Sequence, residues 1–212
     1  MLELSQVILG VRDLDAATCR MEALGLTVLD GGAHPGVGTA NRVVPLGRQY
    51  LELLGVVDEA EARAGWYGRA LLAAIAGGDR LVRWSLRTDR IEEVAARLGL
   101  TPEGRQRVRP DGVRLTWKAA GIAPAAELGW LPFFMQWDDP AQYPGVQPVR
   151  HANGANGVAW IEVAGPDPDR LARWTEGADV PLRVVPGAPG LRRVALATDG
   201  GEIGRASCRE RV

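Results

Sequence analysis

Cysteine and long apolar runs are both scarce in this chain of 212 residues. Its two cysteines, Cys19 and Cys208, lack partners at the spacing of a metal site or a disulfide, which favours a reduced, cytoplasmic protein. No apolar run approaches the roughly 20 residues that span a bilayer, and the first residues lack the basic start and cleavage site of a secretion signal. We therefore expect a cytoplasmic protein with no membrane partner.

A charge excess of one sign is also missing. The formal net charge is −1. Lys118 is the only lysine, and the other Lys and Arg positions are all arginine. The chain thus has no basic field that would attract nucleic acid. Its 7 tryptophans lie mostly within apolar segments, which favours core packing over base stacking. We expect no nucleic-acid partner.

Three segments of the chain share one pattern: QVILGVRDLDAATCRMEALGL, VRWSLRTDRIEEVAARLGL and VAWIEVAGPDPDRLARWTEG. Each has an apolar run, an aspartate and then a helical pattern. The aspartates, Asp13, Asp89 and Asp167, are 76 and 78 residues apart. Such a run predicts a buried strand, and an aspartate at the start of the following helix can accept hydrogen bonds from its free N–H groups. A glycine that supplies a left-handed cap ends each helix (Gly25, Gly99 and Gly177).

Further strands are expected after each helix. The expected strands are 26–30, 40–46 and 50–57, then 104–108, 113–119 and 132–137, and finally 181–185 and 191–198. Residues 58–78 predict a bridging helix. The sequence therefore predicts an α+β fold of tandem βαβββ modules. The expected parts are 1–78, 79–150, a truncated third repeat at 151–201, and a tail at 202–212 that resembles vector sequence.

Three stretches, HPGVGTANRVVPLG, YLELL and PFFMQWDDP, resemble the glyoxalase-like branch of the vicinal oxygen chelate superfamily. That superfamily includes glyoxalase I, extradiol dioxygenases and bleomycin-resistance proteins. The resemblance covers roughly residues 4–200. It implies that paired modules curve into a cupped mixed sheet around a small-molecule ligand, with metal ligands on the first and fourth strands of each module. Such cups are often completed by a homodimer.

The metal positions that the resemblance implies match only in part. Gln6 stands where a first-strand histidine is usual, whereas Glu52 matches the usual fourth-strand glutamate. In the second module the corresponding places fall near Arg83 or Trp84 and near Gln136. Arginine and tryptophan are not ligands for Zn²⁺, Mn²⁺ or Fe²⁺. We expect no stoichiometric metal; if a divalent metal is bound, its ligands are Glu52, Gln6 and Gln136.

Glu52 alternates with Leu51 and Leu53, so its side chain points to the opposite face of the sheet from theirs. On a concave face it would serve as a metal ligand or as a general base with a raised pKa. The alternative is a partly exposed glutamate or one paired with an arginine.

His34 lies in the glycine-rich stretch GGAHPGVGT. This stretch is no phosphate cradle, because it lacks the Gly-Lys-Ser/Thr ending and a strand follows it. A loop that brings His34 to a ligand and a surface turn both stay open. Asn41 opens the next strand, where it either faces a substrate carbonyl or makes hydrogen bonds at the strand entry.

Two further places hold polar and aromatic candidates. In PFFMQWDDP, alternation places Phe134 and Gln136 on one face and Phe133, Met135 and Trp137 on the other. Aromatic rings beside an amide are typical of a pocket wall and also of an ordinary core. The second histidine, His151, lies in the polar linker HANGANG, where a solvated side chain is the simpler expectation.

These residues favour an enzyme that binds and transforms a small organic molecule by carboxylate-assisted carbonyl or enolate chemistry, with metal assistance as an open alternative. The catalytic candidates are Glu52 and His34. The substrate-binding candidates are Asn41, Gln136, Trp84, Gln6 and Trp137. The alternative function is non-catalytic sequestration of an antibiotic or a hydrophobic metabolite.

Overall fold

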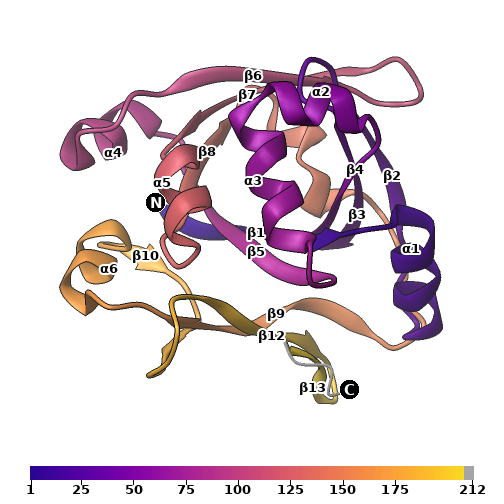
Figure 1. The fold of residues 1–212 in the computed structure, drawn as a ribbon. Coiled ribbons are helices and arrows are strands. Elements are labelled where there is room, and N and C mark those ends of the chain that lie inside the picture. The colour runs from indigo at the N-terminus through magenta and orange to yellow at the C-terminus, as the bar shows by residue number, and fades with distance from the viewer. Residues whose placement is uncertain (208–212) are drawn as a thin grey trace.

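The computed structural model describes residues 1–207, and eight of its strands form a barrel-like cup (Figure 1). Around the cup the order is β1 (Leu2–Val11), β4 (Gln49–Val56), β3 (Thr39–Leu46), β2 (Leu29–His34), β6 (Glu103–Val108), β7 (Arg114–Ala120), β8 (Phe133–Trp137) and β5 (Arg80–Arg87). Antiparallel pairing of β5 with β1 closes the circle. The expected α+β architecture with a cupped sheet is confirmed.

Two modules of equal topology build this cup. The first contains β1, α1 (Leu14–Ala23) and β2–β4, and the second contains β5, α4 (Ile91–Leu98) and β6–β8. The modules meet at β1–β5 and, through the single pair Ala33 and Val108, at β2–β6. In the register, Ile8 of β1 pairs with Glu52 on one side and with Arg83 on the other. Paired residues share a face of the sheet, so these three side chains point into the cup.

The repeated aspartates and glycines mostly act as the sequence predicts. The Asp13 carboxylate accepts from the backbone N–H groups of Asp15 and Ala16 at 2.8 and 2.9 Å. Asp167 likewise accepts at 2.8 Å from Arg170 at the start of α6 (Pro168–Trp174). The three helix-ending glycines have φ angles of +81°, +66° and +72° (Gly25, Gly99 and Gly177). The left-handed glycine caps are therefore confirmed.

Asp89 is the exception among the three aspartates. Residue Arg90 occupies the N-cap position of α4 and makes no side-chain capping bond. The backbone N–H of Ile91 instead donates to Oε1 of Gln136, at 3.0 Å. Asp89 turns outward and pairs with the amino group of Met1 at 3.3 Å. An amide from the neighbouring strand β8 thus replaces the expected aspartate cap.

Three short helices cover the concave side of the cup. The expected bridging helix is divided at Gly65, whose backbone is extended, into α2 (Glu59–Ala64) and α3 (Trp66–Ile75). A further helix that the sequence analysis did not predict, α5 (Ile122–Leu128), joins β7 to β8. Leu71 and Ile75 of α3 pack with Ile8 and Leu54 of the strands, so one end of the cup is filled with apolar side chains.

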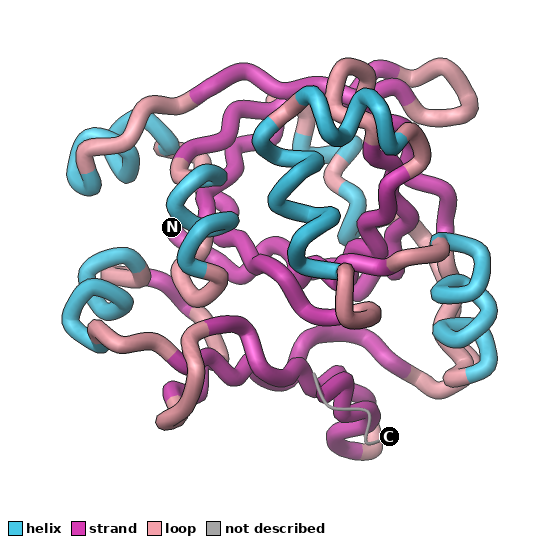
Figure 2. Tube along the Cα trace, in the orientation of Figure 1, coloured by secondary structure: helices cyan, strands magenta, loops and turns pink. Residues whose placement is uncertain are grey.

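The third repeat forms a separate sheet below the cup (Figures 1 and 2). Its strand order is β11 (Leu182–Val184), β9 (Ala155–Ala164), β12 (Gly190–Thr198) and β13 (Gly201–Ser207). The two-residue strand β10 (Ala178–Asp179) joins β1 instead, and the short 3₁₀ turns Pro140–Gln142 and Pro144–Val146 precede β9. Figure 2 shows α1, α4 and α6 at the edges of the molecule.

The main hydrophobic core lies between the outer face of the cup and this second sheet. Trp84 and Trp130 are buried there with Ile161 and Leu191. Of the expected vector-like tail, 202–207 belongs to β13 and 208–212 lies outside the described residues. The vector-derived origin of that tail stays a prediction.

Candidate functional site

A cavity of about 440 Å³ lies within the cup. Its walls come from seven strands of the cup, from the turn that follows β2 and from the starts of α3 and α5. This volume is in the range of small-molecule sites in proteins, roughly 300–1,000 Å³. Residues far apart in sequence therefore enclose a space that fits a small organic ligand.

Glu52 stands on the wall of this cavity with only 6% of its surface exposed. Its Oε1 accepts a hydrogen bond from Nδ2 of Asn41 at 2.8 Å, and Oδ1 of Asn41 accepts one from Arg107 at 2.5 Å. Burial raises the pKa of Glu52, although Asn41, Arg107 and Arg83 each oppose that shift. A carboxylate with a raised pKa in a cavity is suited to accept a proton.

Arg107 is more deeply buried than Glu52, with 3% exposed. Burial lowers the pKa of its guanidinium group, and the nearby Glu52 opposes this shift. Strand β2 approaches this group at Gly31, which has no side chain. A Cβ at this position would lie 2.0 Å from Oδ1 of Asn41 and 2.6 Å from Arg107. Glycine at position 31 thus makes room for the Asn41–Arg107 contact.

His34 ends β2 and lines the same cavity. Its Nδ1 is hydrogen-bonded to Oγ1 of Thr39, the first residue of β3, at 3.0 Å. Burial, and then the positive charge of Arg107, lower the pKa of His34 to about 4. The imidazole is therefore neutral at pH 7, where it offers one donor and one acceptor. The adjoining turn is attached to α2, because Gly36 N–H donates to Oε1 of Glu61 at 2.7 Å.

Aromatic rings form much of the remaining wall. Trp117 of β7 and Trp137 of β8 are paired in the register, and their ring centroids are 5.0 Å apart. Tyr50 and Tyr67 also line the cavity, and Trp66 lies at its edge with 45% of its surface exposed. Such rings give flat apolar surfaces for a ligand, and the amide of Gln6 adds a polar group beside them.

The cavity thus contains five of the seven predicted site residues, namely Gln6, His34, Asn41, Glu52 and Trp137. Their roles in binding or catalysis stay predictions. The other two, Trp84 and Gln136, point away from it, so their expected place in the site was wrong. Trp84 is fully buried in the outer core, where its Nε1–H donates to the carbonyl of Trp130 at 3.1 Å.

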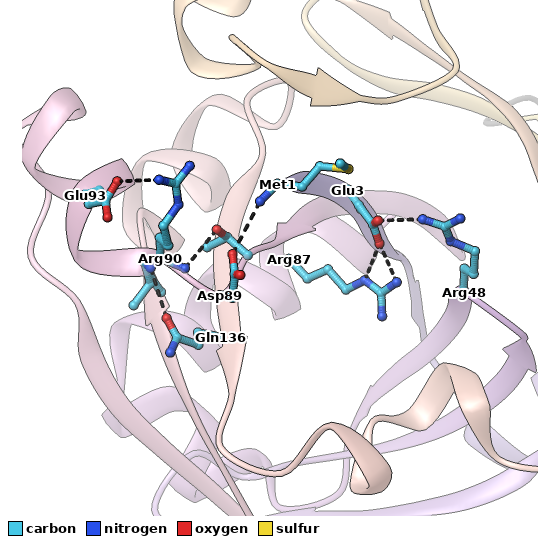
Figure 3. Close-up of polar contacts among 10 residues, drawn as sticks. Met1, Glu3, Arg48, Arg87, Asp89, Arg90, Glu93 and Gln136 are labelled. Atoms are coloured by element: carbon cyan, nitrogen blue, oxygen red, sulfur yellow. Dashed lines mark hydrogen bonds and ion pairs between the residues drawn. The ribbon is translucent and has the colours of Figure 1, made fainter.

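Gln136 lies on the outer face of β8, opposite to Phe133, Met135 and Trp137. Figure 3 shows its amide directed at the start of α4, beside Arg90. The expected alternation along β8 is confirmed, but Trp137 and not Gln136 lies on the inner face. Gln136 therefore cannot belong to a ligand set with Glu52 and Gln6.

The second histidine has a structural place outside the cavity. Nδ1 of His151 accepts from the backbone N–H of Thr27 at 2.8 Å. Its Nε2 lies 2.6 Å from the carbonyl oxygen of Pro45 and, as the protonated nitrogen of this tautomer, donates to it. The expected solvated loop histidine was wrong: the side chain is buried and connects the linker to the first module.

The residues of the cavity that the sequence analysis missed include Tyr50, Tyr67, Arg107 and Trp117. Tyr50 was accessible to the same reasoning as Glu52, because residues two apart on a strand share a face. No comparable signal existed for Arg107 and Trp117, since their facing depends on how the two modules pair. Tyr67 belongs to a helix whose position over the cup has no local signature.

The residues of this cavity do not fit a divalent metal ion. In the described part of the chain, no group of three or more His, Cys, Asp and Glu side chains is placed to hold one. Among residues 1–207, Glu52 is the only carboxylate on the cavity wall, and Arg107 and Arg83 add positive charge near it. Protein sites for such metals usually combine three or four donors of nitrogen, sulfur or carboxylate oxygen. We therefore derive no chemical step through a metal.

A comparison with protein families now identifies the chain. A family model described as a glyoxalase-like domain matches residues 6–178. The chain belongs to this glyoxalase-like domain family. A search among curated proteins returned no match. In the described part of this glyoxalase-like domain, no helix has the length and apolar character to cross a membrane.

Solved structures agree with the family assignment at the level of the fold. A hypothetical protein from Staphylococcus aureus aligns with a TM-score of 0.71 and 14% identity, covering 95% of this chain and 98% of that one. The Mn(II)-bound glyoxalase from Novosphingobium aromaticivorans aligns with a TM-score of 0.52 and 14% identity, over 91% of this chain and 64% of that one. At such identities the glyoxalase-like domain shares the fold with these proteins, and their ligands are their own.

Proposed function

We propose that this glyoxalase-like domain binds a small organic molecule in its cup and uses Glu52 to remove a proton from a carbon next to a carbonyl group. One observation carries the proposal: the only carboxylate that the described residues place on the cavity wall is buried, has a raised pKa and is held by a single amide. Burial of a carboxylate without a charged partner costs free energy, and raised carboxylate pKa values are frequent at catalytic sites.

The proposed step needs no oxidant and no second substrate. The C–H bond next to the carbonyl breaks, the proton moves to Glu52, and the electron pair is delocalised onto the carbonyl oxygen as an enolate. Return of the proton from the neutral Glu52 to carbon or to oxygen completes an isomerisation. The hydrogen bond from Asn41 fixes Oε1 of Glu52 and so holds the carboxylate in one orientation for the proton transfer.

Two neutral groups support the enolate in this proposal. Gln6 lies on β1, next to Tyr50 in the register and two residues before Ile8, the partner of Glu52. Its amide can donate a hydrogen bond to the carbonyl oxygen. His34 is neutral above pH 4 and can act as a second donor or as a proton shuttle.

Deuterium exchange tests the proposal. Three compounds with exchangeable protons next to a carbonyl are used in D₂O: 4-phenyl-2-butanone, 3-benzoylpropionate and its methyl ester. We expect the protein to accelerate exchange of at least one compound, as followed by proton NMR. We also expect Glu52→Gln to reduce this acceleration by about 100-fold or more, because general bases contribute roughly 10²–10⁴. The rate should rise with pH through a pKa above 4.5.

Glu22→Gln is the matched control, since Glu22 is exposed on α1 and the change in charge is identical. Exchange at the wild-type rate in Glu52→Gln, or no accelerated exchange of any of the three compounds, would contradict the proposal. Binding without exchange would favour the alternative function, in which the cup only sequesters its ligand. The stacked pair of Trp117 and Trp137 is the feature that both functions share.

A further inference from the structure

The charges buried around the cavity are unequal. Two arginines, Arg107 and Arg83, are each 3% exposed, whereas Glu52 is the only buried carboxylate among the described residues. With His34 neutral, the formal charge of this buried set is +1. Buried charges are normally paired, because an isolated ion loses several kcal/mol of hydration free energy. The set therefore lacks one negative charge.

Neither arginine forms an ion pair within the described part of the chain. Arg107 donates to the neutral amide oxygen of Asn41, and Arg83 stacks on Tyr67 with its guanidinium carbon 4.3 Å from the ring centroid. The Nε atoms of both arginines are buried and have no hydrogen-bond partner among the described residues. The Asn41 amide separates Arg107 from Glu52, so the carboxylate leaves the guanidinium incompletely neutralised.

Other charged groups do not remove this imbalance. Arg105, two residues before Arg107 on β6, also lines the cavity but already pairs with Glu103 at 2.5 Å. Arg109, two residues after it, pairs with Asp111 and lies outside the cavity, beside a neighbouring hollow that Arg107 also borders. Within the part of the chain that the structure describes, Arg107 is thus the cavity-lining arginine without a carboxylate partner, and it lies between two neighbours that have one.

A flat apolar wall lies next to this unmatched charge. In the register Arg105 pairs with Trp117, and Trp117 pairs with Trp137. The wall therefore begins on β7, the strand next to β6. Its first residue, Trp117, lies opposite Arg105, which is two residues along β6 from Arg107. Two residues along a strand span about 7 Å, which a side chain with one aromatic ring and a short spacer can bridge. Within residues 1–207, the buried Nε1 of Trp137 has no hydrogen-bond partner.

We propose that the ligand of the cup is an aromatic carboxylic acid, whose carboxylate binds Arg107 and whose ring lies against Trp117 and Trp137. The planar guanidinium group matches a carboxylate in shape and supplies the positive charge that the site leaves unpaired. This inference rests on the proposed function in placing the ligand beside Glu52, and it adds the class of substrate.

Matched pairs of compounds test the charge requirement on the wild-type protein. Each pair has the same ring with a carboxylate or with a neutral group: benzoate and benzamide, 2-naphthoate and 2-naphthamide, and 3-benzoylpropionate and its methyl ester. Binding is measured by quenching of tryptophan fluorescence and by calorimetry at pH 7. We expect at least one carboxylate to bind, and each binding carboxylate to do so at least 10-fold more tightly than its neutral partner.

Variants of the protein assign the effect to one residue. Arg107→Gln should abolish the preference for the carboxylates, and Arg107→Lys should restore part of it because the charge returns without the planar shape. Arg109→Gln is the matched control: it removes the same charge from the same segment, outside the cavity, and should keep the preference. Circular dichroism confirms that each variant is folded.

Two results would overturn the inference: the neutral compounds bind as tightly as the carboxylates or more tightly, or no carboxylate binds at concentrations up to about 10 mM. Both are measured on the wild-type protein, so neither depends on a folded variant. A preference that survives in Arg107→Gln would also overturn it. These outcomes are distinct from a failure of the proposed function. Carboxylates that bind through Arg107 without exchange dependent on Glu52 refute only the proton transfer. Exchange that depends on Glu52 and is equally fast for the ester refutes only the substrate class.

Discussion

The inner and the outer face of the cup differ in whether their buried polar atoms have hydrogen-bond partners. On the outer face, Nε1 of Trp84 donates to Trp130, and both ring nitrogens of His151 have backbone partners. On the inner face, buried atoms without a partner occur in Gln6, Arg107 and Trp137, and Arg83 holds the fourth such atom of the described residues, behind Tyr67. Every one of these atoms thus lies at or next to the cavity.

This difference separates the groups that stabilise the fold from those that await a ligand. A buried donor or acceptor without a partner costs about 1–3 kcal/mol, and the cost is tolerated where binding or catalysis requires the group. Among the described residues, the outer face carries no such unpaired buried atom, and it provides the main core. We therefore expect substitutions on the two faces to differ in both size and sign.

The largest expected effect is on the outer face. Trp84→Ala should lower the free energy of unfolding by roughly 3–5 kcal/mol, because it opens a cavity in the core and leaves the carbonyl of Trp130 unpaired. Urea unfolding followed by circular dichroism measures this change. Trp137→Ala is the comparison on the inner face, where the ring already borders a cavity. Equal losses for the two variants would remove the distinction between the faces.

A smaller effect is expected from His34 on acidification. Because its pKa is about 4 in the folded protein and 6.5 in the unfolded chain, the unfolded state binds more protons between these values. Stability should therefore fall as the pH drops from 6.5 to 4, by up to about 3 kcal/mol. The difference between wild type and His34→Asn, measured by urea unfolding at several pH values, isolates this contribution. A difference that stays constant over this range would show that His34 titrates normally.

The smallest expected effect is opposite in sign. Burial raises the pKa of Glu52, so the unfolded state binds fewer protons above pH 4.5, and the group lowers stability as the pH rises through its folded pKa. Glu52→Gln should then increase the free energy of unfolding at pH 7, with no gain below pH 4.5. Loss of stability in this variant at pH 7 would mean that Asn41, Arg107 and Arg83 outweigh the effect of burial.

Local patterns predicted much of the fold. Strands β3 and β4 lie within a residue of the expected 40–46 and 50–57, since their apolar residues leave little choice of structure. The same alternation placed Glu52 on the opposite face of the sheet from Leu51 and Leu53, and that face is the inner one. By contrast, β2 was expected at 26–30 and lies at Leu29–His34, because Gly31 and Gly32 lack the side chains that identify a strand.

Long-range pairing explains what the sequence concealed. Residues 103–108 have the polar pattern of an exposed strand, and Arg107 is buried only because β6 meets β2 of the other module. Likewise, alternation separated Gln136 from Trp137 correctly, but only the pairing of β8 with β7 and β5 decides which of them faces inward. Spacing within one strand carries no information on these pairings.

A crystal structure of the protein with 3-benzoylpropionate shows directly whether the cup binds an aromatic carboxylate through Arg107, beside Glu52. We expect the ligand inside the cup, with its carboxylate on Arg107, its ring against Trp117 and Trp137, and the carbon next to its ketone within reach of Glu52. A ligand bound at another surface, while the cup of the same crystal contains only solvent, would contradict it.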